Sequence, residues 1–396
     1  MKWEKVKLGD VCEITSSKRI FYSEYVDDGV PFYRSKEIIE SDEGKIIENP
    51  LYISVDKYNE IKEKFGVPQT GDMLLTSVGT IGIPYIIKKK DRFYFKDGNL
   101  TWFRDFREGL NSKYLYYWIK SSEGTGTLYN TTIGSSQKAL TISALKNIKV
   151  SLPPRSVQDK IVEVVSVYDD LIENNQKQIK LLEEAAQRLY KEWFVDLNFP
   201  GHENTKIVDG VPEGWNEKTL SQVANVIMGQ SPKSEFYNSE KKGLPFHQGV
   251  GSYGVRFVMD DIYSTSYTRI AKPNSILFSV RAPVGRLNIT KNKVVIGRGL
   301  AAINQTDGCQ SYLYYLLKNK FFKDNIVGNG SIFASVSKDE LLNQKFLIPE
   351  RNLMMQFEKI VSQMDKQIEN LDSKNKKLIE ARDRLLPKLM SGEVEV

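Results

Sequence analysis

Two long stretches of heptad-patterned sequence, residues 157–194 and 353–390, constrain what this chain can fold into. In each stretch, seam residues recur every seven positions in two rows, which is typical of a coiled coil. At ~1.5 Å per residue, about 38 residues make a helix roughly 57 Å long. The rows are Ile161, Tyr168, Asn175, Leu182, Leu189 with Val165, Ile172, Ile179, Ala186, Trp193, and then Phe357, Met364, Leu371, Leu378, Leu385 with Val361, Ile368, Asn375, Arg382, Leu389.

Each seam contains one asparagine, Asn175 or Asn375. A buried Asn costs stability unless it meets another polar group, so we expect these two side chains to pair and to set the register. An antiparallel pairing then aligns the other layers, and Trp193 meets Phe357. A parallel pairing with the rows in phase would instead place each Asn against an apolar residue. The sequence therefore predicts an antiparallel coiled coil within one chain.

Two features fit this prediction less well. One layer sets Tyr168 against Arg382, and Pro387 should kink or fray the last turn, because proline lacks an N–H and clashes with the preceding turn. The alternative arrangement is that each helix packs only on its own globular neighbour.

The rest of the chain also repeats. Trp3–Leu8 matches Trp215–Leu220, Gly71–Val78 matches Pro273–Val280, and Leu115–Tyr117 matches Leu313–Tyr315. Short apolar runs between Gly, Pro and Asn predict strands, and Leu- and Tyr-rich segments predict helices. The fold class is therefore α+β, with two pseudo-repeated domains separated by the two long helices. We expect domain 1 at 1–152, a spacer helix at 153–197, domain 2 at 198–349 with a linker at 198–213, and a second spacer helix at 350–396.

Composition excludes several protein classes. No apolar run approaches the length of a membrane span, and the N-terminus lacks the apolar core of a signal peptide. Two cysteines, Cys12 and Cys309, suit a reducing cytoplasm, and two unclustered histidines make a zinc site improbable. No phosphate-binding loop, HExxH motif or nucleophile elbow is present, so we expect no catalytic site and no cofactor bound by this chain.

Basic and polar side chains on glycine-rich loops remain as candidates for function, and the net charge of +6 permits nucleic-acid binding. Arg, Lys, Gln and Asn can contact bases or phosphates, although each alone could be an ordinary surface residue. Their position where the two repeats diverge, at 16–45 and 228–270 above all, favours binding. The candidates are Lys18, Arg19, Tyr22, Arg34, Lys36, Ser77, Thr80, Lys138, Lys233, His247, Gln248, Arg256, Arg281, Arg286, Arg298 and Ser331.

Several motifs together resemble the specificity subunit of Type I restriction-modification systems, over essentially the full chain. They are Gly71–Leu75, Leu152–Pro154, Leu189–Asp196, Pro212–Trp215 and Arg382–Gly392, in that order and with the repeat.

This resemblance implies two target-recognition domains that each read one half of a split DNA sequence, with the helices as a ruler. Two partner methyltransferase subunits would dock on the helices and methylate adenine with S-adenosylmethionine, and a motor-nuclease subunit using ATP and Mg would join for cleavage. The specificity subunit itself would be non-catalytic. A different function is a stand-alone, sequence-specific DNA-binding or scaffolding protein with an internal coiled coil. Co-purification with a methyltransferase subunit distinguishes the two.

Overall fold

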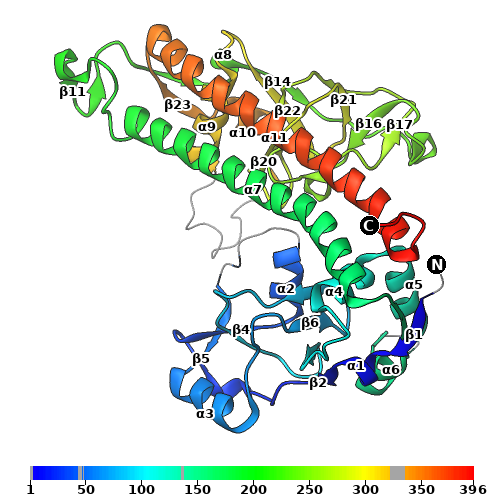
Figure 1. The fold of residues 1–396 in the computed structure, drawn as a ribbon. Coiled ribbons are helices and arrows are strands. Elements are labelled where there is room, and N and C mark those ends of the chain that lie inside the picture. Colours follow the sequence, from blue (N-terminus) through cyan, green and yellow to red (C-terminus); the bar gives the residue numbers. More distant parts are fainter. Residues whose placement is uncertain (1–2, 43–46, 48, 135–137, 322–334) are drawn as a thin grey trace. The chain divides into compact units, whose positions relative to one another are not determined.

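The computed structural model describes residues 3–42, 47, 49–134, 138–321 and 335–396 (Figure 1). Two compact units make up the chain, residues 1–178 with 371–396 and residues 179–370. Each unit therefore contains a globular part and a segment of both long helices. The expected domain boundaries at 152, 197 and 349 stay a prediction.

The two long helices are α7 (Arg155–Phe194) and α11 (Arg351–Ser391), green and orange to red in Figure 1. α7 begins directly after a pair of prolines, and the carbonyl of Pro154 accepts the first helical hydrogen bond, from Gln158. Proline is suited to this position because the first helical N–H groups have no partner within the helix.

Within each unit the helices run antiparallel. In the first unit, Asn175 Nδ2 donates to Asn375 Oδ1 at 2.7 Å, and both side chains are buried. In the second unit, the rings of Trp193 and Phe357 lie 6.0 Å apart. The predicted antiparallel register is confirmed at these two layers.

In the layer of Tyr168 and Arg382, the arginine pairs with a neighbouring carboxylate. Arg382 Nη1 lies 2.6 Å from Asp169 Oδ1, so the arginine pairs with the carboxylate next to Tyr168. Of the two outcomes expected at Pro387, fraying is wrong, because α11 continues to Ser391, and a kink stays a prediction. Leu386, Leu389 and Met390 around the proline are buried, and this packing holds the last turn in place.

α11 ends at a glycine that can adopt a left-handed conformation. Gly392 has φ +72°, its N–H donates to the carbonyl of Leu389, and the N–H of Glu393 donates to that of Lys388. This pattern is a Schellman motif, which satisfies carbonyls that the helix leaves without partners.

The globular part of the first unit contains two four-stranded sheets, in the orders β2-β9-β6-β7 and β3-β5-β4-β8, and the pair β1-β10. All neighbours are antiparallel except β4 and β8. Its elements are β1 (Glu4–Lys7), α1 (Leu8–Val11), β2 (Glu13–Thr15), β3 (Tyr25–Val26), β4 (Val30–Tyr33), α2 (Ser35–Asp42), β5 (Leu51–Ile53), α3 (Val55–Phe65), β6 (Met73–Thr76), β7 (Pro84–Ile86), β8 (Tyr94–Phe95), β9 (Leu100–Arg104), α4 (Ser112–Lys120), α5 (Ser122–Thr131), α6 (Ile142–Asn147) and β10 (Lys149–Leu152).

The second unit repeats this topology with two additions, a fifth strand (β18) in one sheet and a further two-stranded pair, β11-β12. Its sheets have the orders β14-β22-β19-β20 and β15-β17-β16-β21-β18, the pair that corresponds to β1-β10 is β13-β23, and the parallel neighbours are β16 and β21. Its elements are β11 (Ile207–Val208), β12 (Val211–Pro212), β13 (Asn216–Thr219), α8 (Leu220–Val223), β14 (Ala224–Met228), β15 (Tyr237–Asn238), β16 (Leu244–His247), β17 (Tyr263–Ser264), β18 (Ile270–Ala271), β19 (Ile276–Ser279), β20 (Leu287–Ile289), β21 (Val294–Ile296), β22 (Leu300–Gln305), α9 (Gln310–Phe321), α10 (Lys338–Leu342) and β23 (Lys345–Ile348).

Each unit packs its tyrosine-rich helix against its segment of the coiled coil. In the first unit, Tyr114 and Trp118 of α4 are fully buried in a core that also includes Val165 of α7 and Leu389 of α11. In the second unit, Tyr312 of α9 packs on Phe194 of α7 with ring centroids 5.0 Å apart. The globular parts are thus fastened to the helices by apolar and aromatic contacts, which leaves their loops free to differ.

Candidate nucleic-acid interface

In the first unit, predicted basic residues gather where the parallel strands β4 and β8 end. Arg19 Nε lies 2.8 Å from Asp97 Oδ2 in the loop after β8, and the backbone N–H of Lys18 donates to Tyr94 Oη at 2.7 Å. Ser35 Oγ, in the segment after β4, donates to the carbonyl of Asn99 at 3.4 Å. The loops that carry Lys18, Arg19 and Arg34 therefore meet at one edge of the sheet, and Lys36 lies in the first turn of α2 beside them.

These cations differ in how available they are. Arg34 binds Glu37 with two nitrogens, at 2.6 and 3.3 Å, and this hydrogen bonding raises the pKa of Arg34. Lys36 pairs loosely with Glu40 at 3.6 Å and remains 60% exposed, and Arg19 is 68% exposed despite its ion pair. Tyr22, three residues after Arg19 in the sequence, is 90% exposed. Lys18 is also exposed, with Nζ 4.4 Å from the centre of the Phe65 ring. The side chains accessible to a ligand are thus those of Lys18, Arg19, Lys36 and Tyr22.

The other predicted residues of the first unit lie on a second pair of loops. The backbone of Leu140 donates to the carbonyl of Ser77, which brings Thr80 and Lys138 onto neighbouring segments. Lys138 Nζ lies 3.5 Å from the centre of the Tyr129 ring, and its hydrogen bond lowers the pKa of that phenol. Thr80 is exposed.

In the second unit, hydrogen bonds between loops bring the amide and basic candidates together. Ser231 Oγ donates to Gln248 Oε1 at 2.8 Å and accepts from the N–H of Arg298 at 3.2 Å. The N–H of Val280 donates to the carbonyl of Gly299, next to Arg298 in sequence. Arg281, the residue after Val280, therefore lies near the loop that carries Arg298. Gln248, Arg281 and Arg298 are exposed, and so is Lys233, whose segment begins at Ser231.

Glycines make this close approach of loops possible. A Cβ added at Gly297 would lie 2.6 Å from Gln248 Oε1, and one at Gly229 would lie 2.1 Å from the carbonyl of Gly297. Neither position has room for a side chain, so these residues fix the spacing of the loops around Gln248. Two residues that form hydrogen bonds here were not predicted. They are Ser231, which donates to Gln248, and Thr268, whose hydroxyl donates to the carbonyl of Gln230. Their only signal was their place in the segment where the repeats diverge.

Three predicted residues are buried and hydrogen-bonded, and we withdraw them from the DNA-binding set. Ser77 Oγ bonds to Thr101 Oγ1 at 2.7 Å. His247 is 1% exposed, and its Nδ1 forms a hydrogen bond with Ser252 Oγ at 2.9 Å. Arg256 is 3% exposed and its guanidinium pairs with Asp365, a residue of α11.

The last two candidates are Arg286 and Ser331. Arg286 is half-buried in the turn between β19 and β20. Ser331 lies outside the described residues.

Each unit therefore presents exposed arginine and lysine next to hydroxyl or amide groups on loops held by the sheet. Such groups can contact phosphates and can also form paired hydrogen bonds to base edges. Within the described ranges, no cluster of three or more His, Cys, Asp or Glu side chains could hold a metal ion. In the same residues, no helix combines the length and apolar character that crossing a bilayer requires.

Comparison with known proteins gives consistent matches along the chain. The family model described as "Type I restriction modification DNA specificity domain" matches residues 1–184 and 212–381.

Two proteins of Methanocaldococcus jannaschii are similar over the whole chain. The type I restriction enzyme MjaIX specificity subunit is 28% identical, and the match covers 100% of this chain and 94% of the relative. The MjaVIII specificity subunit is 23% identical over 100% of this chain and 93% of the relative.

One solved structure, the S subunit of a Type-I restriction-modification system from M. genitalium, has a similar fold. Its TM-score is 0.59 at 17% identity, covering 98% of this chain and 96% of that one. At this identity the likeness concerns the fold alone.

Proposed function

Because this chain belongs to the Type I restriction modification DNA specificity family, we propose that it is the DNA sequence-specificity subunit of a Type I restriction-modification complex. Each globular domain reads one half of a bipartite target. The observation that carries the proposal is the repeated sheet topology, with exposed basic and amide groups on loops that differ between the repeats. One scaffold with two different loop sets suits the reading of two different half-sites.

The two long helices set the distance between the half-sites. The Asn175–Asn375 pair fixes the register of the helices, and a fixed register gives a fixed length of coiled coil between the domains. The protein would then require an unspecified spacer of constant length between its half-sites.

The helices also dock the methyltransferase subunits. Val164, Val167 and Leu171 of α7 lie outside the seam, at spacings of three and four residues, and are 37%, 53% and 45% exposed. Residues at these spacings share one face of a helix. An exposed apolar stripe of this kind is suited to a helix-packing partner.

This chain performs recognition, and its partners perform the chemistry. Methyltransferase subunits would transfer a methyl group from S-adenosylmethionine to adenine N6, and motor-nuclease subunits, where present, would use ATP and Mg. We place the assembly in the cytoplasm, where the two free, buried cysteines Cys12 and Cys309 suit a reducing environment.

Methylation mapping tests the reading and spacing roles together. Seven residues with seam-compatible sequence are inserted after Gln178 and seven after Leu371, so that the Asn175–Asn375 and Trp193–Phe357 layers are both kept. The extra helix of about 10.5 Å should lengthen the spacer by at most about three base pairs and leave both half-sites unchanged. A changed half-site with an unchanged spacer, or a wild-type methylome without bipartite sites, would contradict the proposal.

Co-purification tests the docking role. Val167→Asp with Leu171→Asp should abolish capture of the methyltransferase subunit, because it places charges in an apolar contact. Glu163→Ala, on the same helix next to Val164, is the matched control and should leave capture intact. Equal capture by both variants would refute docking on this stripe.

A further inference from the structure

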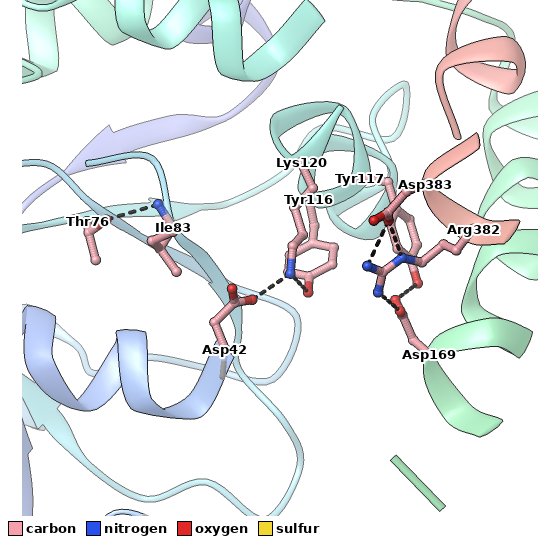
Figure 2. A network of polar contacts seen from close by, with 9 residues as sticks. All are labelled: Asp42, Thr76, Ile83, Tyr116, Tyr117, Lys120, Asp169, Arg382 and Asp383. Atoms are coloured by element: carbon pink, nitrogen blue, oxygen red, sulfur yellow. Dashed lines mark hydrogen bonds and ion pairs between the residues drawn. The ribbon is translucent and has the colours of Figure 1, made fainter. Parts of the chain in front are cut away.

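The first unit contains a polar junction between its globular domain and the two helices. Tyr117 Oη of α4 donates to Asp169 Oδ2 of α7 at 2.7 Å, and Arg382 Nη1 of α11 lies 2.6 Å from Asp169 Oδ1 (Figure 2). One carboxylate thus joins a domain tyrosine to a helix arginine. The arginine also pairs with Asp383 at 2.8 Å.

A related junction occurs in the second unit, where the tyrosine hydroxyl accepts its hydrogen bond from an arginine. Asp365 of α11 stands 196 residues after Asp169, and Tyr315 of α9 corresponds to Tyr117 in the repeated Leu-Tyr-Tyr motif. The same offset makes Ala186 of α7 the counterpart of Arg382. Ala186 is fully buried and carries no charge, so the helix offers no cation to Asp365 here.

The cation comes from the globular domain instead. Arg256, in the loop between β16 and β17, places Nη2 2.5 Å from Asp365 Oδ1 and Nη1 3.4 Å from Tyr315 Oη. Its guanidinium lies 3.8 Å from the centre of the Tyr314 ring, and Glu183 is a longer contact at 3.5 Å. The side chain is 2% exposed.

The burial of the Arg256–Asp365 ion pair determines how much stability its removal would cost. A buried ion pair contributes little net stability, but removal of one partner leaves an uncompensated charge and is strongly destabilising. The guanidinium also holds four groups from three elements, α7, α9 and α11, in one geometry. The planar fork and stacking surface of arginine suit it to that task better than lysine.

We propose that Arg256 is a positioning residue, which fixes the second globular domain on its helices by supplying the cation that Arg382 supplies from a helix in the first unit. The inference rests on the proposed function, since the domain so fixed is taken to read DNA. It follows that the two domains are not interchangeable. A first domain moved to the second position would leave Asp365 without a cation, and a second domain moved to the first would bring two arginines to Asp169.

A double-mutant cycle in the full chain, assembled with its methyltransferase subunits, tests the exchange. Arg256→Ala should lower the Tm, and Ala186→Arg alone should also lower it, because it crowds a second cation against Arg256. Combined, the two changes rebuild the arrangement of the first unit and should restore much of the Tm. Opposite effects of Ala186→Arg in the two backgrounds are the expected signature. Additive losses would overturn the proposal.

Half-site fidelity provides a readout that overall stability does not determine. At a temperature where every variant is folded, Arg256→Ala should relax recognition in one half-site only, the one that Arg298→Ala also affects. Arg382→Ala should relax the other, and Arg256→Ala with Ala186→Arg should regain the wild-type motif. Relaxation of both half-sites, or of neither, would refute the positioning role. A wild-type methylome that is not bipartite would refute the proposed function, while the Tm cycle would still test the junction.

Discussion

Asn175 and Asn375 face each other across α7 and α11, and a 2.7 Å hydrogen bond joins their amides. They stand 200 residues apart in sequence, and each is the asparagine of an otherwise largely apolar seam. A polar pair of this kind contributes specificity of register more than stability, because any slip would bury an unpaired amide.

Asn175→Leu should therefore destabilise the protein. The change leaves the Asn375 amide buried without a partner, and we expect a loss of about 1–3 kcal/mol in the free energy of unfolding. Asn175→Leu with Asn375→Leu removes both polar groups and should be much closer to wild type. Denaturant unfolding monitored by circular dichroism measures both. A double variant less stable than the single one would contradict this account.

Two glycines in one helix should respond in opposite directions to alanine. A Cβ at Gly124 of α5 would lie 1.9 Å from the carbonyl oxygen of Trp118, whereas one at Gly126 meets nothing within 4 Å. Gly124→Ala should cost about 1–3 kcal/mol through overpacking. Gly126→Ala should stabilise by roughly 0.5–1 kcal/mol, since alanine favours the helix. Thermal unfolding of the two variants makes the comparison, and equal shifts in Tm would rule it out.

Glu358 should give the protein a measurable pH dependence. Burial raises its pKa above the usual 4.5, although hydrogen bonds from Ser311 and Tyr312 at the start of α9 act in the opposite direction. The folded state then keeps a proton that the unfolded chain has already released. The free energy of unfolding should fall as pH rises from 4.5 to the raised pKa. Against the non-titrating Glu358→Gln, wild type should lose stability over that interval, and a constant difference would refute the assignment.

Arg298 should contribute to DNA affinity through charge. It is exposed on the loop that Ser231 and Gln248 hold in place. In the assembled complex, Arg298→Ala should weaken binding and reduce the salt dependence of log K by about 1 if the contact is to a phosphate, or relax one base position if it is to a base. Lys345→Ala, a 65% exposed residue of β23, is the control. An unchanged affinity for Arg298→Ala at low and high salt would remove it from the interface.

The long helices and their register could be predicted because seam periodicity and a lone buried amide are local signals with strong physical consequences. The Asn175–Asn375 and Trp193–Phe357 layers follow from that register alone. Fraying at Pro387 was wrongly predicted, because the helix rule considers the missing N–H and not the buried side chains that flank it.

Loop residues were harder to assign, because exposure depends on distant packing. Arg256 resembles the other arginines of the divergent loops, and only the fold shows that it reaches Asp365, 109 residues later. His247 and Ser77 face inward for the same reason: strand ends alternate between the two faces of a sheet, and short strands give little pattern. The helix repeat did contain a signal, since Ala186 replaces the arginine expected from Arg382.

The composition of the core of the first unit affects the order in which the two units fold during synthesis. Leu386, Leu389 and Met390 belong to the same apolar cluster as Leu8, Ile14 and Trp118. A ribosome delivers the residues of α1 and α4 long before those of the last helical turns, so the earliest domain to emerge waits for the final segment to close its interior. The second unit, formed from residues 179–370, has no such delay, and the later half of the chain should therefore mature first during synthesis.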